Sequence, residues 1–208
     1  MPNEVIEAIG SAAVLLALLI CTGDLVELGP SLVGCFLRWK ENVALYNNMK
    51  LRRKRNKLAL CITPAILLVF SRYPIWNIFE NTSPLIAYCN MVIVFLAYIL
   101  LRVLCRLVFC RGDYAAKEFD QQADLVVNYF IITSVVLFAL FGSCRLLCVP
   151  DELVVRILLY SSAAIYCLLL VREMQVLSSM RGFLPSFLYL CALEILPTGI
   201  LVASHYFL

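Results

Sequence analysis

The residue of this sequence best suited to chemistry is an acid inside a hydrophobic segment, Glu194 in LYLCALEILPTG. A span that begins near Phe183 and rises about 1.5 Å per residue places this carboxylate roughly 15 Å deep, near the centre of a bilayer. A charge at that depth costs at least about 2.5–3.5 kcal/mol, so we expect the acid to be paired, hydrogen-bonded or protonated. Pro197 has no N–H to offer the carbonyl of Leu193, which leaves a second polar group beside the acid.

Arg102 is the best-placed partner for Glu194. The predicted span over residues 85–108 puts Arg102 roughly 9–10 Å from its C-terminal end, within the reach of a long side chain. Arg106 shares the face of Arg102, and Asn128 adds a polar side chain in another span. The predicted intramembrane polar centre therefore consists of Glu194, Pro197, Arg102, Arg106 and Asn128.

Two interpretations of this polar centre remain open. The structural one is an ion pair or polar network that fixes how the helices pack. The functional one is a proton or ion relay, or a docking site for a partner helix or a lipid headgroup. One intramembrane acid without a histidine provides few groups for a proton relay, which favours the structural interpretation. The sequence thus predicts that Arg102 and Glu194 pair across the bundle and leaves the use of the pair open.

The sequence offers few candidate residues for a cation, metal, cofactor or catalytic site. Asp113, Glu118, Asp120 and Asp124 fit no established cation-binding spacing, and a short solvated helix is the favoured interpretation of their segment. The ten cysteines form no CxxC, and His205 is the single histidine of the sequence, so neither a metal nor a cofactor is predicted. P-loop, nucleophile-elbow and HExxH patterns are absent from the sequence. We therefore predict that the protein is not an enzyme.

The elements that must position these residues are predicted to be transmembrane helices. Of the 208 residues, 63% are hydrophobic and 15% charged, whereas soluble domains are about 45–50% apolar and about 25% charged. Apolar runs near the length of about 20 residues needed to cross a bilayer recur along the chain. The predicted fold class is an all-α integral membrane protein, a bundle of about six transmembrane helices forming a single domain over residues 1–208. The predicted spans are residues 5–21, 58–75, 85–108, 125–141, 153–171 and 183–206.

The segment LVELGPSLVGCFLRW, residues 25–39, is predicted to be an interfacial helix. Gly29 and Pro30 break it, and it is too short to cross a bilayer. Its apolar residues share one helical face, and Trp39 at its end suits the headgroup level. A re-entrant segment is the alternative.

The basic stretch KLRRKRNK, residues 50–57, is predicted to lie at the cytoplasmic membrane surface. Beside a span, such a stretch is a topology signal and a contact for anionic headgroups far more often than a nucleic-acid site. This orientation places fourteen of the 17 Lys and Arg residues on or near the cytoplasmic side, so both termini are predicted to face outward. The acidic start MPNEVIE lacks the basic region of a signal peptide, so residues 5–21 are predicted to be a retained span. The residues assigned to headgroup contact and topology are Lys50, Arg52, Arg53, Lys54, Arg55 and Lys57.

The C-terminal segment FLPSFLYLCALEILPTGIL resembles the LYLCxLEIxP signature of an uncharacterised family of bacterial inner-membrane proteins. The residues that carry the resemblance are Phe187, Leu188, Tyr189, Leu190, Cys191, Leu193, Glu194, Ile195 and Pro197. The resemblance implies a multi-pass protein of the bacterial cytoplasmic membrane, an all-helical fold and no established activity.

A small bundle with short loops and no catalytic motif is expected to act by binding its neighbours. The leading prediction is a non-catalytic accessory or scaffold subunit of a bacterial inner-membrane complex, in protein export, membrane insertion or envelope biogenesis. The alternative is a small transporter or channel that uses Glu194 for proton or ion coupling. A lipid-modifying membrane enzyme ranks third because the motif is missing. The predicted partners are membrane lipids and other integral membrane proteins, without nucleic acid.

Overall fold

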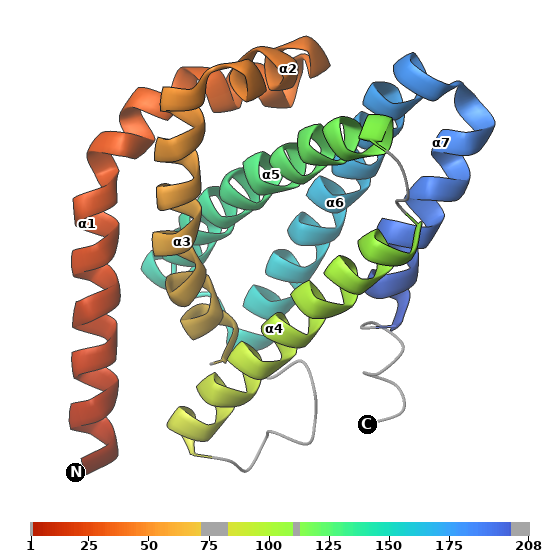
Figure 1. Ribbon diagram of the computed structural model, residues 1–208. Coiled ribbons are helices and arrows are strands. Elements are labelled where there is room, and N and C mark those ends of the chain that lie inside the picture. The colour runs from red at the N-terminus through yellow and green to blue at the C-terminus, as the bar shows by residue number, and fades with distance from the viewer. Residues whose placement is uncertain (1, 72–82, 110–112, 201–208) are drawn as a thin grey trace.

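The computed structural model describes residues 2–71, 83–109 and 113–200, and within these ranges the chain forms helices and no strand (Figure 1). The all-helical prediction is therefore confirmed for the described residues. The helices are α1 (Pro2–Leu37), α2 (Trp39–Asn47), α3 (Met49–Ser71), α4 (Pro84–Phe109), α5 (Asp113–Leu146), α6 (Asp151–Arg181) and α7 (Phe183–Leu190), and α7 continues through a π-helical turn (Cys191–Ile195) into a last helical stretch over residues 196–200.

Three of the described helices contain segments long and apolar enough to cross a membrane: Leu85–Leu104, Asp120–Leu146 and Asp151–Ser179. Many large apolar side chains of these helices point outward. Leu96 and Leu159 are examples, and more than half of the surface of each of these two residues is exposed. Soluble proteins rarely expose so much contiguous apolar surface. These features are the ones expected of a membrane protein.

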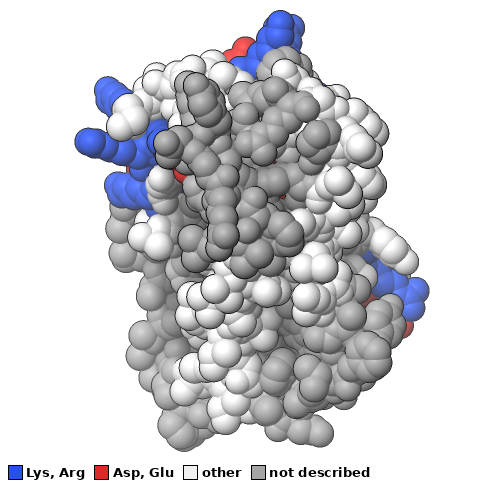
Figure 2. Space-filling view, turned by 45° about the vertical axis from the view of Figure 1, so that its right-hand side comes forward, with Lys and Arg blue, Asp and Glu red and all other residues white. Residues whose placement is uncertain are grey.

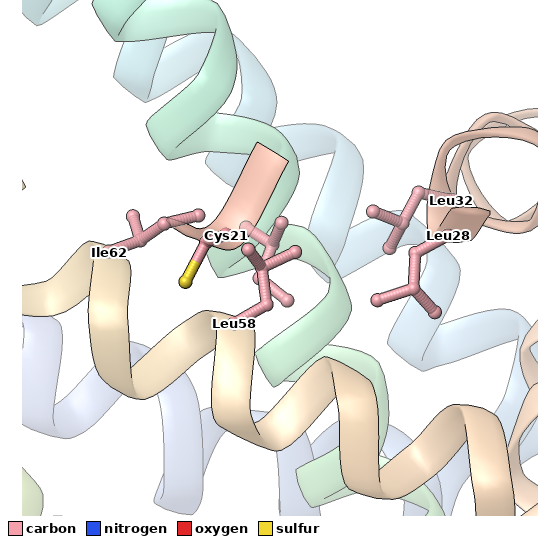
Figure 3. Close-up of a cluster of buried hydrophobic side chains, with 6 residues drawn as sticks. Cys21, Leu28, Leu32, Leu58 and Ile62 are labelled. Atoms are coloured by element: carbon pink, nitrogen blue, oxygen red, sulfur yellow. The ribbon is translucent and has the colours of Figure 1, made fainter. Parts of the chain in front are cut away.

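The core lies where α5 meets α1, α3 and α6. One buried cluster joins Cys21, Leu28 and Leu32 of α1 to Leu58 and Ile62 of α3, whose side chains point toward one another in Figure 3, and it also includes Ile131 of α5. Two further clusters join α5 to α6, and the first of them also includes α3: Ile66, Leu137, Cys144, Val154 and Leu158 form one, and Leu125, Tyr129, Leu169 and Val176 form the other. α5 is therefore the central helix of the packed bundle.

The N-terminal helix differs from the prediction. Residues 25–37 form the C-terminal part of α1, with Pro30 inside the helix, and do not form a separate interfacial helix. Burial of Leu28 and Leu32 against α3 outweighs the hydrogen bond that Pro30 forfeits, and α1 bends in this region in Figure 1. The break falls at Arg38, whose backbone is extended, and α2 begins after it. The side chain of Trp39 lies outside the described residues.

Helix ends follow ordinary local rules at the turns of the described chain. The tight turn after α5 holds Cys148 at a φ of 51°, and Asp151 then stands in the first turn of α6, where a carboxylate stabilises the positive end of the helix dipole. Gly182 has a φ of 85°, a conformation that glycine adopts without a Cβ clash, and it separates α6 from α7. The successive long helices α3, α4, α5 and α6 thereby alternate in direction through the bundle (Figure 1).

Candidate functional site: an acid cluster beside an apolar cavity

Glu194 forms an ion pair with Arg102 in the structure. The Nη2 atom of Arg102 donates a hydrogen bond to Oε1 of Glu194. The Glu194 side chain is 1% exposed and the Arg102 side chain 23% exposed. The pair joins α4 to the C-terminal helical segment, as the sequence predicts.

A second acid, Glu173 of α6, lies beside this pair. Its Oε1 atom is 4.0 Å from Nη2 of Arg102, and its side chain is fully buried. The amide of Gln122 lies beside the carboxylate of Glu173, and neither oxygen makes a hydrogen bond of ordinary geometry with a described residue. We call Arg102, Glu173 and Glu194 the acid cluster. Two carboxylates share one guanidinium group, and a proton on one of them makes the cluster neutral, which avoids burying an unbalanced charge.

The π-helical turn Cys191–Ile195 sets the position of Glu194. The N–H of Leu196 donates to the carbonyl of Cys191, five residues back. The wider turn has a local cause, because the ring of Pro197 clashes with the carbonyl four residues before it and forces the helix to open. The predicted local distortion at Pro197 therefore takes the form of a π-helical turn.

Tyr166 of α6 holds this turn from the side. Its hydroxyl lies 2.9 Å from the hydroxyl of Thr198 and donates a hydrogen bond of 3.2 Å to the backbone carbonyl of Glu194. A π turn leaves backbone carbonyls without their usual helical partners. Tyr166 supplies a partner and ties the acid cluster to α6.

An apolar cavity of about 810 Å³ lies between α3, α4 and α5, next to the acid cluster. Its polar end is formed by Asn56, Arg102 and Gln122, one from each helix. Phe95 and Phe130 line it farther along, with ring centroids 6.3 Å apart. The amide nitrogen of Gln122 is buried and has no hydrogen-bond partner within the described ranges. Arg102 is the member of the acid cluster that faces the cavity.

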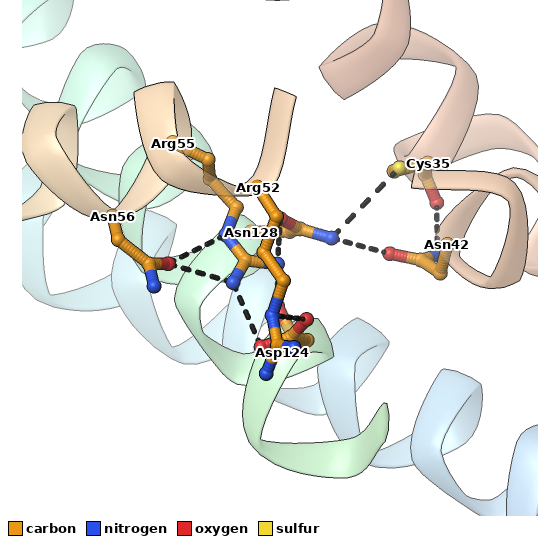
Figure 4. A network of polar contacts seen from close by, with 7 residues as sticks. All are labelled: Cys35, Asn42, Arg52, Arg55, Asn56, Asp124 and Asn128. Atoms are coloured by element: carbon orange, nitrogen blue, oxygen red, sulfur yellow. Dashed lines mark hydrogen bonds and ion pairs between the residues drawn. The ribbon is translucent and has the colours of Figure 1, made fainter. Parts of the chain in front are cut away.

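A second polar network lies between α3, α5 and α2 (Figure 4). Arg55 is fully buried, and its Nη2 is 2.7 Å from Oδ1 of Asp124, whose other oxygen is 2.8 Å from Nε of Arg52. Asn128 accepts a hydrogen bond of 3.4 Å from Arg55 and donates one of 2.9 Å to Asn42 of α2. We call this the arginine network; its members are Cys35, Asn42, Arg52, Arg55, Asn56, Asp124 and Asn128.

The thiol of Cys35, at the edge of this network, is also shielded. Burial raises its pKa to about 12, and the nearby carboxylate of Glu41 raises it further against the opposing charge of Arg55. The carbonyl of Cys35 accepts a hydrogen bond of 3.1 Å from Asn42. Cys35 is therefore a protonated packing residue at neutral pH.

The basic stretch of residues 50–57 has two kinds of surroundings. Lys50 and Arg53 are exposed, as expected for headgroup contacts. Lys54 pairs with Glu27, and the ammonium of Lys57 is 3.4 Å from a carboxylate oxygen of Asp24. The assignment of Arg55 to headgroups is wrong, because its guanidinium is buried against Asp124, and Arg52 pairs with the same acid.

Two other predicted members of the polar centre lie elsewhere. Asn128 belongs to the arginine network, not to the acid cluster, because its side chain points toward Arg55 and Asn42. The side chain of Arg106 lies outside the described residues. Pro197 is buried next to the cluster.

The burial of Arg55 and Glu173 was not predicted, although each lies on the buried face of its helix. Arg55 stands three residues before Leu58 and seven before Ile62, on the same buried stripe of α3. Glu173 likewise follows the buried Leu169 by four residues and precedes the buried Val176 by three. A polar residue at a position where the pattern demands an apolar one marks a buried partner.

No group of three or more His, Cys, Asp or Glu side chains suited to a metal ion occurs in the described part of the chain. The resemblance of its C-terminal segment to a bacterial inner-membrane family stays a prediction. No family model, no curated protein and no solved structure matches this chain.

Proposed function

We propose that this protein is a small membrane carrier that couples a proton to the movement of a ligand, with the acid cluster as the coupling site. The observation that supports it best is the position of Glu173. A structural ion pair with Arg102 needs one acid, and Glu194 already supplies it. A second, fully buried carboxylate that is 4.0 Å from the guanidinium group is a cost to stability if it is charged. Buried membrane acids of this kind belong to proton and ion pathways.

The coupling follows from the charge of the cluster. With one carboxylate ionised, Arg102 is held by an acid and ties α4 to the segment that follows α7. With both carboxylates protonated, the guanidinium keeps its charge without an ionic partner and becomes available on the cavity side. The two protonation states thus favour two different arrangements of α4, which is the requirement for a two-state carrier.

We further propose six crossings of a bacterial cytoplasmic membrane, with both termini outside. The alternating directions of the long helices support this arrangement (Figure 1). Lys and Arg atoms gather at the top and upper left of the face in Figure 2, and a smaller mixed group lies on the right, slightly below mid-height, with white surface above and below it. The basic zone at the top suits the cytoplasmic side of a bilayer.

The test of a carrier is access to the cavity from both sides. Val127 lines the cavity, so a Val127→Cys variant in a cysteine-free background reports on access when a membrane-impermeant thiol reagent is added to sealed vesicles of each orientation. We expect labelling from both faces, with rates that change in opposite directions between pH 6 and pH 8, because protonation of the cluster shifts the population.

A matched control is Val154→Cys, since Val154 is fully buried away from the cavity and is expected to stay unlabelled. The Glu173→Gln/Glu194→Gln variant is expected to abolish the pH effect on Val127→Cys. Labelling of Val127→Cys from one face only, at one rate across the pH range, contradicts a carrier.

The role as an accessory subunit of an export, insertion or envelope complex stays a prediction. Its test is affinity purification of the tagged chain from its native membrane in mild detergent, followed by mass spectrometry. Stoichiometric recovery of one larger complex across several detergents supports the subunit role, and recovery of the chain alone supports the carrier.

A further inference from the structure

We infer that the cavity between α3, α4 and α5 binds a single-chain amphiphilic anion, with its head group at Arg102 and its chain along the apolar wall. This inference rests on the proposed function, since it names the ligand class of the same site.

The polar end of the cavity offers hydrogen-bond donors. Both contacts of Arg102 with the acids are made by Nη2, so these two acids do not occupy its Nε and Nη1 donors. The amide nitrogen of Gln122 is a further buried donor at this end of the cavity, next to the carboxylate of Glu173. A ligand that satisfies these groups must present acceptor oxygens, and a carboxylate matches the fork of a guanidinium group.

The remainder of the cavity is an apolar channel. Asn56 and Leu67 mark its two ends on α3, a separation of roughly 16 Å along the helix axis. Aromatic and aliphatic side chains line this length, among them Phe95 and Phe130. The volume of about 810 Å³ falls within the range of roughly 300–1,000 Å³ that encloses drug-sized ligands, which favours one hydrocarbon chain over a two-chain phospholipid.

The cavity also has access to the surface of the bundle. Leu60 and Leu96 line it and are 76% and 57% exposed. Both belong to the apolar surface that a bilayer covers, so a lipid-soluble ligand can enter sideways from the membrane.

The charge balance of the acid cluster explains why the ligand is an anion and why its binding is coupled to uptake of a proton. The groups that face the cluster are Arg102 and Tyr98 from α4, Gln122 from α5, Glu173 and Tyr166 from α6, and Glu194 and Thr198 from the C-terminal segment. When an anion joins Arg102, one more negative charge enters a buried site, and uptake of one proton by the carboxylates restores neutrality.

The test is binding of radiolabelled dodecanoate to the full chain in phosphatidylcholine nanodiscs, with empty nanodiscs subtracted. Unlabelled dodecanoate is expected to displace the label at least tenfold more effectively than dodecyltrimethylammonium, which has the same chain and a cationic head. Equal displacement by the two overturns the inference, and so does equal displacement by phosphatidylglycerol built into the nanodisc, which indicates a phospholipid site.

The variant Arg102→Gln/Glu194→Gln removes both charges of the ion pair together, which avoids leaving an unpaired buried charge. We expect it to weaken dodecanoate binding at least tenfold. The exposed pair of Arg156 and Glu152 on α6 provides the control, since Arg156→Gln/Glu152→Gln is expected to bind as the parent protein does. Unchanged binding in the Arg102 variant overturns the inference.

Proton uptake separates this inference from the proposed function. Dodecanesulfonate stays ionised, so its binding in weakly buffered solution is expected to remove about one proton per ligand from the medium, followed with an indicator dye. Anion selectivity without proton uptake keeps the ligand class and refutes proton coupling. Proton uptake without anion selectivity keeps proton coupling and refutes the ligand class.

Discussion

At the residue scale, the hydroxyl of Tyr166 is a sensitive point of the acid cluster. It forms hydrogen bonds with both the carbonyl of Glu194 and the hydroxyl of Thr198. We expect Tyr166→Phe to lower the free energy of unfolding by about 1–3 kcal/mol, because a buried carbonyl loses its partner. Tyr160 on the same helix is 71% exposed, so Tyr160→Phe is expected to change little. Thermal unfolding in detergent compares the two, and an equal effect of both variants refutes the role of Tyr166.

Cys35 gives a prediction about pH. A pKa raised to about 12 keeps the thiol protonated below that pH, and the thiolate is the species that reacts. We therefore expect Cys35 to resist alkylation by iodoacetamide from pH 7 to pH 9 in the folded protein. Unfolding is expected to expose it and restore ordinary reactivity. Peptide mass spectrometry measures both, and rapid modification of Cys35 in the folded state at pH 7 contradicts its burial.

Depth along a helix made the Arg102–Glu194 pair predictable from the sequence. The position of Glu173 was not predicted, because a hydropathy window ends at the first charges and so placed the end of its span at residue 171. Arg55 was assigned to the membrane surface for a related reason. The composition of a basic stretch does not say which of its neighbouring cations is buried. The amphipathic stripe of each helix contains that information.

At the scale of elements, the arginine network fastens α3 to α5. We expect Arg55→Met to lower the free energy of unfolding by about 3–5 kcal/mol, because Asp124 is left buried with a weaker partner. The double variant Arg55→Met/Asp124→Leu is expected to recover most of that loss. Arg53→Met is the matched control, since Arg53 is an exposed arginine of the same stretch. A loss in Arg53→Met as large as in Arg55→Met shows that the network is not the cause.

The π-helical turn is the second element with a testable role. Pro197→Ala restores an N–H that can donate to the carbonyl of Leu193, so we expect the turn to close into an α-helix. That closure shifts Glu194 away from Arg102. A double-mutant cycle with Arg102→Gln and Glu194→Gln is expected to give a coupling of about 0.5–3 kcal/mol in the parent chain and near zero in the Pro197→Ala background. An unchanged coupling shows that the turn does not position the acid.

The lengths of the elements were predictable only in part. α4 matches its predicted span closely, since most of its residues are apolar and only Asn90, Arg102 and Arg106 interrupt the run. α3 begins at Met49, α5 at Asp113, and α6 ends at Arg181, all well beyond the predicted spans. Hydrogen bonding along a helix continues through charged residues, whereas a hydropathy pattern stops at them. The continuous α1 was missed because Pro30 suggested a break that packing against α3 overrides.

At the scale of the whole molecule, Cys148 tests the proposed orientation. It lies exposed in the turn between α5 and α6, at the end predicted to face outward. We expect a membrane-impermeant maleimide to label it in intact spheroplasts, and Cys148→Ser to remove that label. Labelling of Cys148 only in inverted vesicles reverses the orientation.

The distance along the chain between buried partners has a consequence for biosynthesis. Arg55 and Asp124 are 69 residues apart, and Arg102 and Glu194 are 92 residues apart. At roughly 5–20 residues per second, each cation leaves the ribosome about 3–18 s before its acid. During that interval Arg55 and Arg102 lack these acidic partners. The buried ion pairs of α3 and α4 therefore form only after α5 and the C-terminal segment, respectively, have been synthesised.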